Sequence, residues 1–221
     1  MIVTLDGPAS SGKSLAARRL ADRLGWPHLN TGAMYRAVTL AALERGVDLT
    51  DGVALAALAA APELEFTPGS VRVFGRDPGP ALRSRAVDES IKLVADCPAV
   101  RAVLVARQQA MAGEDLVTEG RDQGTIVFPA AALKIYLTAS LATRARRRLG
   151  DVLRDRPGAT LDEVMDDLAR RDADDQGRAI GALRIAADAV QLHTDDLNPE
   201  EVTDRLVALV EAARAAAGGG R

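Results

Sequence analysis

Short apolar runs alternate with helical segments along most of the chain. The run Ile2–Asp6 is typical of a short buried strand. It is followed by a glycine loop and by a helix that carries Leu15, Leu20 and Leu24 and ends at Gly25. A second helix is expected at residues 31–46. Four more runs have the character of buried strands, at residues 26–30, 115–120, 133–138 and 188–194. Such alternation predicts an α/β fold whose parallel sheet is covered on both faces.

The pattern changes between residues 63 and 96. Residues 64–75 read as two strands around a Pro-Gly-Ser turn, which predicts a hairpin. Ser84 is expected to cap a helix, and Pro98 to open the next one. Residues 63–96 are therefore interpreted as an insertion into the α/β core.

The segment 149–160 is charged and contains Pro157 and Gly158. We expect it to separate two helices and to be mobile.

The length of 221 residues favours a single domain over residues 1–221, or one domain with inserted pieces, and is sufficient for a sizeable core. Apolar residues make up 48% of the 221 positions, charged residues 27%, and the net charge is −3, which argues against nucleic-acid binding through a basic surface. The single Cys97 cannot form an internal disulfide. No apolar run is long enough to span a bilayer, and residues 1–6 already read as a strand, which leaves no room for a signal peptide. We expect a cytoplasmic protein, a monomer, with no membrane partner.

The stretch GPASSGKS at residues 7–14 matches a phosphate-binding loop in full. Glycine at Gly7 and Gly12 lets backbone N–H groups surround a phosphate, and the following helix presents its positive end to the anion. Lys13 can reach the β- and γ-phosphates, and the Ser14 hydroxyl can join the Mg²⁺ shell. The alternative is a chance match in a tight turn. Because a strand precedes the loop and a helix follows it, we interpret the loop as a nucleotide site.

The loop alone does not define a reaction, because ATPases, GTPases and small-molecule kinases share it. The guanine-reading N/T-K-x-D motif is absent from the sequence, which weakens the GTPase hypothesis. Arginines and acids that suit an anionic acceptor occur at a helix start, at the carboxyl end of a strand and one turn apart on a helix. They are Arg36, one turn inside the helix that starts at Thr31, then Glu119, Arg121 and Asp122, and finally Arg171, Asp175 and Arg178.

These motifs together resemble the bacterial cytidylate kinase family over nearly the whole chain. DGPASSGKS, NTGAMYRA, the hairpin insertion, VR at 100–101, EGRDQGTIVFP and RRDADDQGR fall in the family's order and spacing. The resemblance implies a P-loop kinase fold with a five-stranded parallel sheet, an inserted acceptor-binding subdomain at 63–96 and an arginine-bearing lid at 144–160. It also implies transfer of the γ-phosphoryl group of ATP to CMP or dCMP, with Mg²⁺ bound to ATP.

The resemblance also implies roles for individual residues. The expected catalytic residues are Lys13, Arg36, Arg121 and Arg178. The expected ATP site comprises Gly7, Pro8, Ala9, Ser10, Ser11, Gly12, Lys13, Ser14, Arg147 and Arg148, with Ser14 toward the metal. The expected CMP site comprises Thr31, Arg36, Lys92, Arg101, Glu119, Arg121, Asp122, Arg171, Asp175 and Arg178.

Arg101 and Asp122 resemble the family's base readers. A carboxylate accepts from the cytosine amine and an arginine donates to the ring acceptors, so the same pair would reject uracil. Arg171 and Asp175 resemble the family's ribose and phosphate contacts. Glu119 occupies a position where the family carries a short acid, and Thr31 one where the family carries a small residue with a hydroxyl group.

Lys92 is a departure, because the family carries a serine there. Its ammonium either donates to the cytosine O2 or extends into water. Ser90, the nearest hydroxyl, is expected to face the opposite side of the helix.

Other interpretations stay open for several residues. Arg36 can be a solvated helix residue, and Asp122 can cap the next helix. Arg144, Arg147 and Arg148 share a helix face that is either solvated or covers ATP. Asp172 and Asp174 are expected to be only solvated.

Two other functions also remain. One is a different P-loop kinase, such as an adenylate or shikimate kinase, and the other is a non-catalytic nucleotide-binding protein. The hairpin insertion and EGRDQGT argue against the first, and the set of arginines argues against the second.

Overall fold

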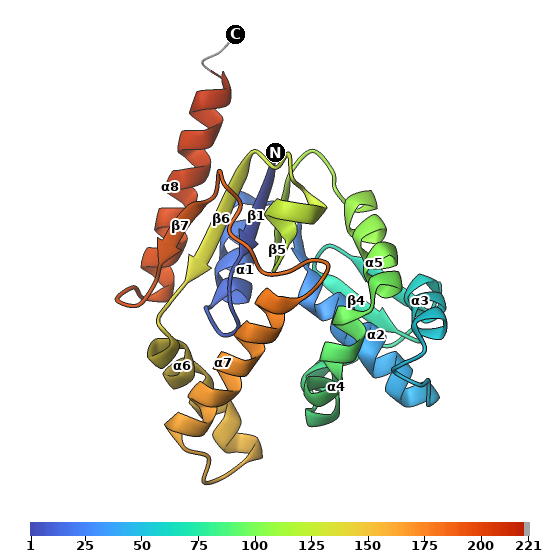
Figure 1. Ribbon diagram of the computed structural model, residues 1–221. Helices are drawn as coiled ribbons and strands as arrows, with labels where there is room; N and C mark the ends of the chain where they lie inside the picture. Colours follow the sequence, from blue (N-terminus) through green and yellow to red (C-terminus); the bar gives the residue numbers. More distant parts are fainter. Residues whose placement is uncertain (219–221) are drawn as a thin grey trace. The chain divides into compact units, whose positions relative to one another are not determined.

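The computed structural model describes residues 1–218, apart from the side chain of Asp155. The chain forms two compact units, one made of residues 1–26 with residues from 115 on, and one made of residues 27–114. Each unit is built from helices and strands that follow one another closely along the chain (Figure 1). No helix of the described part is both long and apolar enough to cross a membrane.

The first unit alternates strands and helices as expected. Its elements are β1 (Ile2–Asp6), α1 (Lys13–Leu24), β5 (Leu116–Gly120), the π-helix η2 (Gln123–Val127), β6 (Leu133–Thr138), α6 (Leu141–Asp155), α7 (Leu161–Gly177), β7 (Val190–His193) and α8 (Pro199–Gly218).

The second unit holds the hairpin and most of its elements are helical. Its elements are β2 (His28–Asn30), α2 (Thr31–Arg45), α3 (Gly52–Ala60), β3 (Leu64–Thr67), β4 (Ser70–Val73), the 3₁₀-helix η1 (Gly79–Arg83), α4 (Arg85–Asp96) and α5 (Pro98–Ala110). The segment 63–96 that was expected to be an insertion lies inside this unit.

The main sheet has five strands in the order β2-β5-β1-β6-β7. β1 pairs in parallel with β5 and with β6, and β6 pairs in parallel with β7. The predicted α/β fold with a five-stranded parallel sheet is therefore confirmed. β1 and β5 end side by side, with Asp6 opposite Gly120, so the segments that follow them start from the same edge of the sheet.

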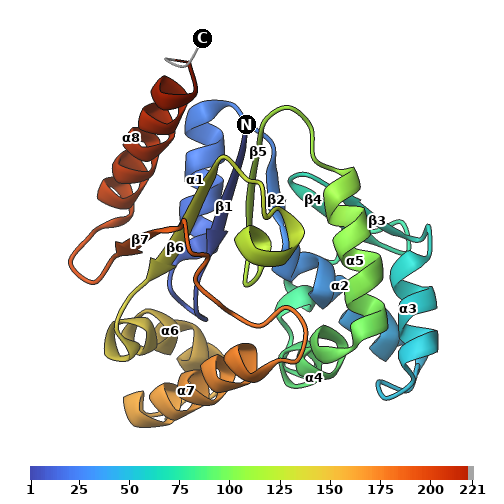
Figure 2. The ribbon, with the colours of Figure 1, turned by 45° about the horizontal axis from the view of Figure 1, so that its top comes forward.

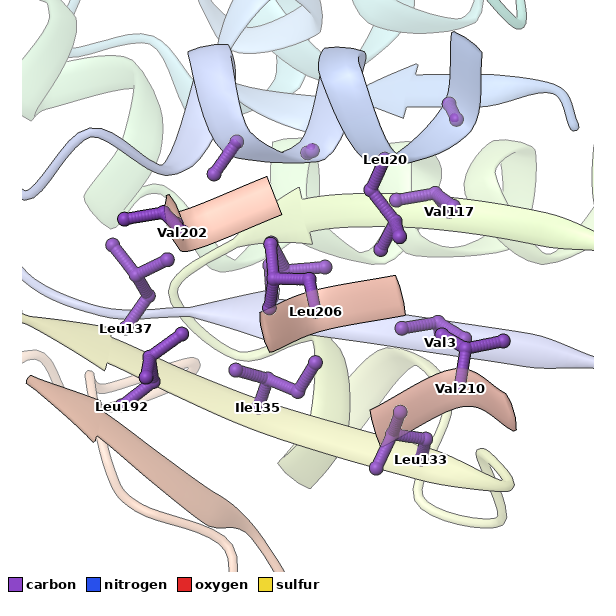
Figure 3. Packing of buried hydrophobic residues seen from close by; sticks show 14 residues of the cluster. Val3, Leu20, Val117, Leu133, Ile135, Leu137, Leu192, Val202, Leu206 and Val210 are labelled. Carbon is purple, nitrogen blue, oxygen red and sulfur yellow. The ribbon is translucent and has the colours of Figure 1, made fainter. Parts of the chain in front are cut away.

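One apolar core fills the space between the sheet and the helices α1 and α8. Val3 of β1 and Val117 of β5 meet Leu20 of α1 and Leu206 of α8, all within the same cluster (Figure 3). α1 and α8 lie side by side on this face of the strands (Figures 1 and 2). Burying each such side chain stabilises the fold by about 1.5–3 kcal/mol, so this core fixes β1 and hence the loop that follows it.

The helix boundaries coincide with capping and terminating residues in the sequence. α1 ends at Gly25 and α2 at Gly46, and both glycines adopt the left-handed conformation that terminates a helix. The Ser84 side chain accepts from Val87 N at the start of α4, and Pro98 is the first residue of α5. These four predictions are confirmed.

Two predictions are wrong in part. Residues 149–155 continue α6, so only residues 156–160 separate the helices α6 and α7. The reason is that α6 buries an apolar stripe against α7 and Ala9, which outweighs the helix penalty of Gly150. β7 was expected to be buried, but only its Leu192 is buried, because β7 is an edge strand.

Candidate active site

The phosphate loop connects β1 to α1 and is held in place by steric constraints. Gly7 has φ +153°, and a Cβ on it would lie 2.0 Å from the carbonyl oxygen of Leu137 on β6. Gly12 has φ +94° and directly precedes the first residue of α1. Ser10 also adopts a positive φ, 58°. The glycines are therefore required for this backbone path, as the motif predicts.

We expect Gly7→Ala to lower the free energy of unfolding by about 3 kcal/mol or more, because strain at positive φ adds to a clash with β6 backbone. Gly25→Ala is the matched control: Gly25 also has positive φ (+68°), but nothing lies within 4 Å of its Cβ position. It should cost only about 1–2 kcal/mol. Urea unfolding of both variants measures the difference, and equal losses would contradict the close approach to β6.

The Lys13 side chain is buried and folds back onto the loop. Its Nζ donates to the carbonyl oxygen of Pro8 at 2.7 Å and to Ser11 Oγ at 3.4 Å. Burial lowers the pKa of Lys13 to about 7, and the positive charge of Arg121 acts in the same direction. A phosphate beside the ammonium opposes both effects, so an anionic ligand restores the charge of this lysine.

The lowered pKa of Lys13 predicts a pH dependence of stability. Between the folded pKa of about 7 and the unfolded value of about 10.4, the unfolded chain binds one proton more than the folded chain, so this lysine makes stability rise with pH. From pH 7.5 to 9, the free energy of unfolding should gain about 2 kcal/mol relative to Lys13→Met. Urea unfolding of both proteins at the two pH values measures it. A pH slope shared by both would show that Lys13 is not the origin.

Asp6 fastens the segment after β5 to the end of β1. Its two carboxylate oxygens accept from the backbone N–H of Gln123 at 2.9 Å and of Gly124 at 2.8 Å. Burial raises the pKa of Asp6 to about 6, although these hydrogen bonds work against the rise. Sequence reasoning assigned no role to Asp6. An acid between a buried strand and a glycine loop is the signal that could have revealed it.

Ser14 and Glu119 lie together at the loop. Ser14 Oγ donates to Glu119 Oε2 at 2.9 Å, and Glu119 is 4% exposed at the end of β5. The assignment of Glu119 to the CMP site by resemblance stays a prediction, and in the structure one of its oxygens accepts from the hydroxyl expected to face Mg²⁺. Hydroxyl and carboxylate oxygens suit this ion. Within residues 1–218 no group of three or more His, Cys, Asp or Glu side chains could hold a metal by itself, so phosphate oxygens would have to complete the shell.

Asp175 holds two of the predicted catalytic arginines. Arg121 Nε lies 2.6 Å from Asp175 Oδ2, and Arg178 Nη2 lies 2.8 Å from Asp175 Oδ1. Burial by itself raises the pKa of Asp175, but the charges and hydrogen bonds of the two arginines outweigh it, so the pKa is lowered. Arg171 lies about one turn earlier on α7. The structure thus brings Arg121, Arg178 and Asp175 together. Two neighbouring arginines of this kind can bind the oxygens of one anion.

Asp122 follows β5 and is buried. Its side chain makes no capping hydrogen bond to η2, whereas its carbonyl oxygen accepts from Ile126 N at 2.8 Å. The interpretation of Asp122 as a side-chain cap is therefore wrong. The π-helix itself was not predicted.

The three arginines of α6 differ in their surroundings. Arg144 is buried, so a solvated face is wrong for this residue. Arg147 Nη1 donates to the carbonyl oxygen of Ser11 at 3.4 Å and its Nη2 to that of Thr194 at 2.5 Å, which places it against the phosphate loop. Arg148 pairs with Asp151 on its own helix, and a role toward ATP stays a prediction.

Four candidate residues belong to the second unit, beginning with Arg36 on α2. Arg36 is not simply solvated: its Nη2 lies 2.6 Å from Asp88 Oδ1 and its Nη1 donates to the carbonyl oxygen of Leu82 at 2.8 Å. Asp88, on α4, was missed by sequence reasoning. Thr31, the first residue of α2, is also buried.

Arg101 and Lys92 lie on the helices α5 and α4 of this unit. Arg101 is buried and its guanidinium lies 5.5 Å from the centre of the Tyr35 ring. The Lys92 side chain is 51% exposed and its ammonium lies 2.7 Å from Asp96 on the same helix. This geometry is that of a surface ion pair and argues against the expected contact of Lys92 with the base.

Comparison with known proteins gives a consistent result. Residues 3–212 match the model of the family described as cytidylate kinase. A cytidylate kinase of Rhodococcus jostii is 45% identical over 224 residues, covering 99% of this chain and 97% of that protein. One of Nocardia farcinica is 44% identical over 218 residues, covering 95% and 93%.

A solved structure supports the fold alone. A shikimate kinase from Bacteroides thetaiotaomicron has a TM-score of 0.50 and 12% identity, covering 96% of this chain and 98% of that one. The predicted P-loop kinase fold is confirmed.

Proposed function

Because this chain belongs to the cytidylate kinase family, we propose that it transfers the γ-phosphoryl group of ATP to CMP or dCMP, giving ADP and CDP or dCDP. One observation carries the proposal beyond the family itself. The first unit contains both a glycine-constrained phosphate loop with a buried lysine and a pair of arginines held by one carboxylate. Phosphoryl transfer needs such cations on both sides of the transferred group.

The donor nucleotide is assigned to the loop. Backbone N–H groups of residues 10–14, at the start of α1, receive the phosphates, and Lys13 supplies the charge at the β- and γ-phosphates. Bound Mg²⁺ neutralises charge on those oxygens. Ser14 and Glu119 are the residues whose oxygens suit that ion, since their side chains already meet at 2.9 Å. Arg147 belongs to this side because it contacts Ser11 of the loop.

The residues assigned to the acceptor nucleotide are given for each unit separately. In the first unit, Arg121 and Arg178 bind the CMP phosphate and the transferring group, and Asp122 accepts from the cytosine amine. Asp175 keeps both arginines in place, and Arg171 lies on the same helix. In the second unit, the resemblance assigns Thr31, Arg36 and Arg101 to the acceptor. Lys92 is left out because of its exposed pair with Asp96.

The proposed arrangement acts through positioning and charge. In the transition state, negative charge spreads over the phosphoryl oxygens, and Lys13, Arg121 and Arg178 are the cations that stabilise this charge. The segment 144–160 is proposed as a lid over ATP and 63–96 as the acceptor subdomain. Exclusion of water protects the phosphoryl group from hydrolysis.

A panel of acceptors tests this function. The purified full chain is incubated with ATP and Mg²⁺ and with CMP, dCMP, UMP, AMP or shikimate, and ADP release is followed in a coupled assay. Rapid turnover with CMP or dCMP, well above UMP, AMP and shikimate, is the expected result. A preference for AMP or shikimate would assign another kinase activity, and no acceptor-dependent turnover would favour a non-catalytic nucleotide-binding protein.

A further inference from the structure

Two charged side chains hold the backbone of Ala9 in the phosphate loop, one at its N–H and one at its carbonyl oxygen. Ala9 N donates to Asp172 Oδ1 at 3.2 Å, and Arg144 Nη1 donates to the carbonyl oxygen of Ala9 at 3.0 Å. Arg144 Nη1 also lies 2.7 Å from Asp172 Oδ2. Its Nε donates to the carbonyl oxygen of Ala139, just before α6, at 3.0 Å. The expectation that Asp172 is only solvated is therefore wrong.

The pair is largely removed from water. The side chains of Arg144 and Asp172 are 8% and 14% exposed, and Ala9 is buried in an apolar cluster with Val164 and Leu168 of α7. That cluster already packs α6 and α7 together. A buried ion pair seldom adds net stability over an apolar one, because desolvating both charges offsets their attraction. Fixing one backbone position is a physical role that apolar packing does not fulfil, because apolar contacts are not directional.

The contact joins the loop assigned to the donor phosphates to the helix that carries Asp175, which holds the arginines assigned to the acceptor phosphate. Ala9 lies in the loop four residues before Lys13, which we assign to the donor phosphates. Asp172 lies on α7 three residues before Asp175, which holds Arg121 and Arg178. Three residues on a helix return the side chain to nearly the same face.

We propose that Arg144 and Asp172 are positioning residues for phosphoryl transfer: they lock the loop at Ala9 against α7, so that Lys13 and the arginines held by Asp175 keep one geometry. This inference rests on the proposed function. Because a displacement of about 1 Å in reacting groups can cost 10²-fold in rate, the pair acts on kcat rather than on substrate binding.

Steady-state kinetics of variants tests the proposal. Asp172→Ala removes the acceptor for Ala9 N and the ion pair with Arg144, whereas Asp172→Asn keeps an acceptor for Ala9 N and loses the charge. Asp166→Asn is the matched control, because Asp166 is an exposed acid on the same helix. We expect Asp172→Ala to lower kcat per folded molecule about 50-fold, with KM for ATP and CMP within about threefold of the control. Asp172→Asn should recover part of the loss, and Arg144→Gln/Asp172→Asn should lose no more than the worse single variant.

A second measurement does not depend on activity. Hydrogen exchange at the amide of Ala9 in the unliganded protein should become at least about tenfold faster in Asp172→Ala and stay unchanged in Asp166→Asn. A kcat of Asp172→Ala within threefold of the control overturns the proposal. If Asp172→Ala does not fold, the test is made with Asp172→Asn, and a kcat of this variant equal to that of the control also overturns the proposal. If even the wild type fails to phosphorylate CMP, the proposed function fails, and unchanged exchange at Ala9 overturns the positioning role separately.

Discussion

Replacing Lys13 with alanine is expected to lower kcat with ATP and CMP by at least about 10³-fold. The ammonium lies on the loop, 2.7 Å from the carbonyl oxygen of Pro8, and no other lysine lies within residues 7–14. In the transition state, negative charge develops on the oxygen that bridges the β- and γ-phosphates. Because the ammonium is needed most at that stage, kcat should fall more than the affinity for ATP. Steady-state kinetics with varied ATP and fixed CMP measures both.

The variant should remain folded, because it removes a group whose burial disfavours its charge. Circular dichroism and thermal unfolding check this. Arg18→Ala serves as the matched control, since Arg18 is an exposed cation on the same helix α1 and should have almost no effect. Near-normal turnover of Lys13→Ala, with unchanged dependence on Mg²⁺, would rule out the assignment of Lys13 to the phosphates.

Local features were predictable because their causes are local. A glycine in the left-handed conformation ends α1 and α2, a serine caps α4, and the loop motif follows β1 directly. The position of the acids and arginines after β5 also follows from the sheet, since parallel strands collect ligands at their carboxyl ends. The arginines proposed as catalytic were named from their positions in the sequence together with the family resemblance.

Contacts between distant segments could not be predicted in this way. Asp172 and Ala9 are 163 positions apart, and nothing in the pattern around Asp172 distinguishes it from its exposed neighbour Asp174. The same holds for the contact of Ser14 with Glu119, whose positions are 105 residues apart along the chain. The course of α6 through Gly150 depends on its packing against α7, so charge and glycine content misplaced the end of the helix.

Arg121→Ala is expected to lower kcat by about 10²–10³-fold, the cost of losing one preorganised donor to a developing charge. It should also raise KM for CMP several-fold, because the arginine is assigned to the acceptor phosphate, while KM for ATP stays within about threefold. Arg121→Lys should recover only part of kcat, since an ammonium lacks the planar fork that binds two oxygens at once. Acceptor and donor titrations at saturating co-substrate give the three parameters.

The partner of Arg121 makes this expectation specific. Its Nε lies 2.6 Å from Asp175, which also binds Arg178, so without Arg121 that carboxylate neutralises Arg178 more completely and weakens its hold on a phosphate. Part of the loss in kcat is therefore indirect. Arg23→Ala is the control, because Arg23 is 47% exposed and forms surface pairs with Glu200 and Asp204. If Arg121→Ala changes only KM for CMP and leaves kcat within threefold, Arg121 binds the acceptor equally in the ground and transition states and is not catalytic.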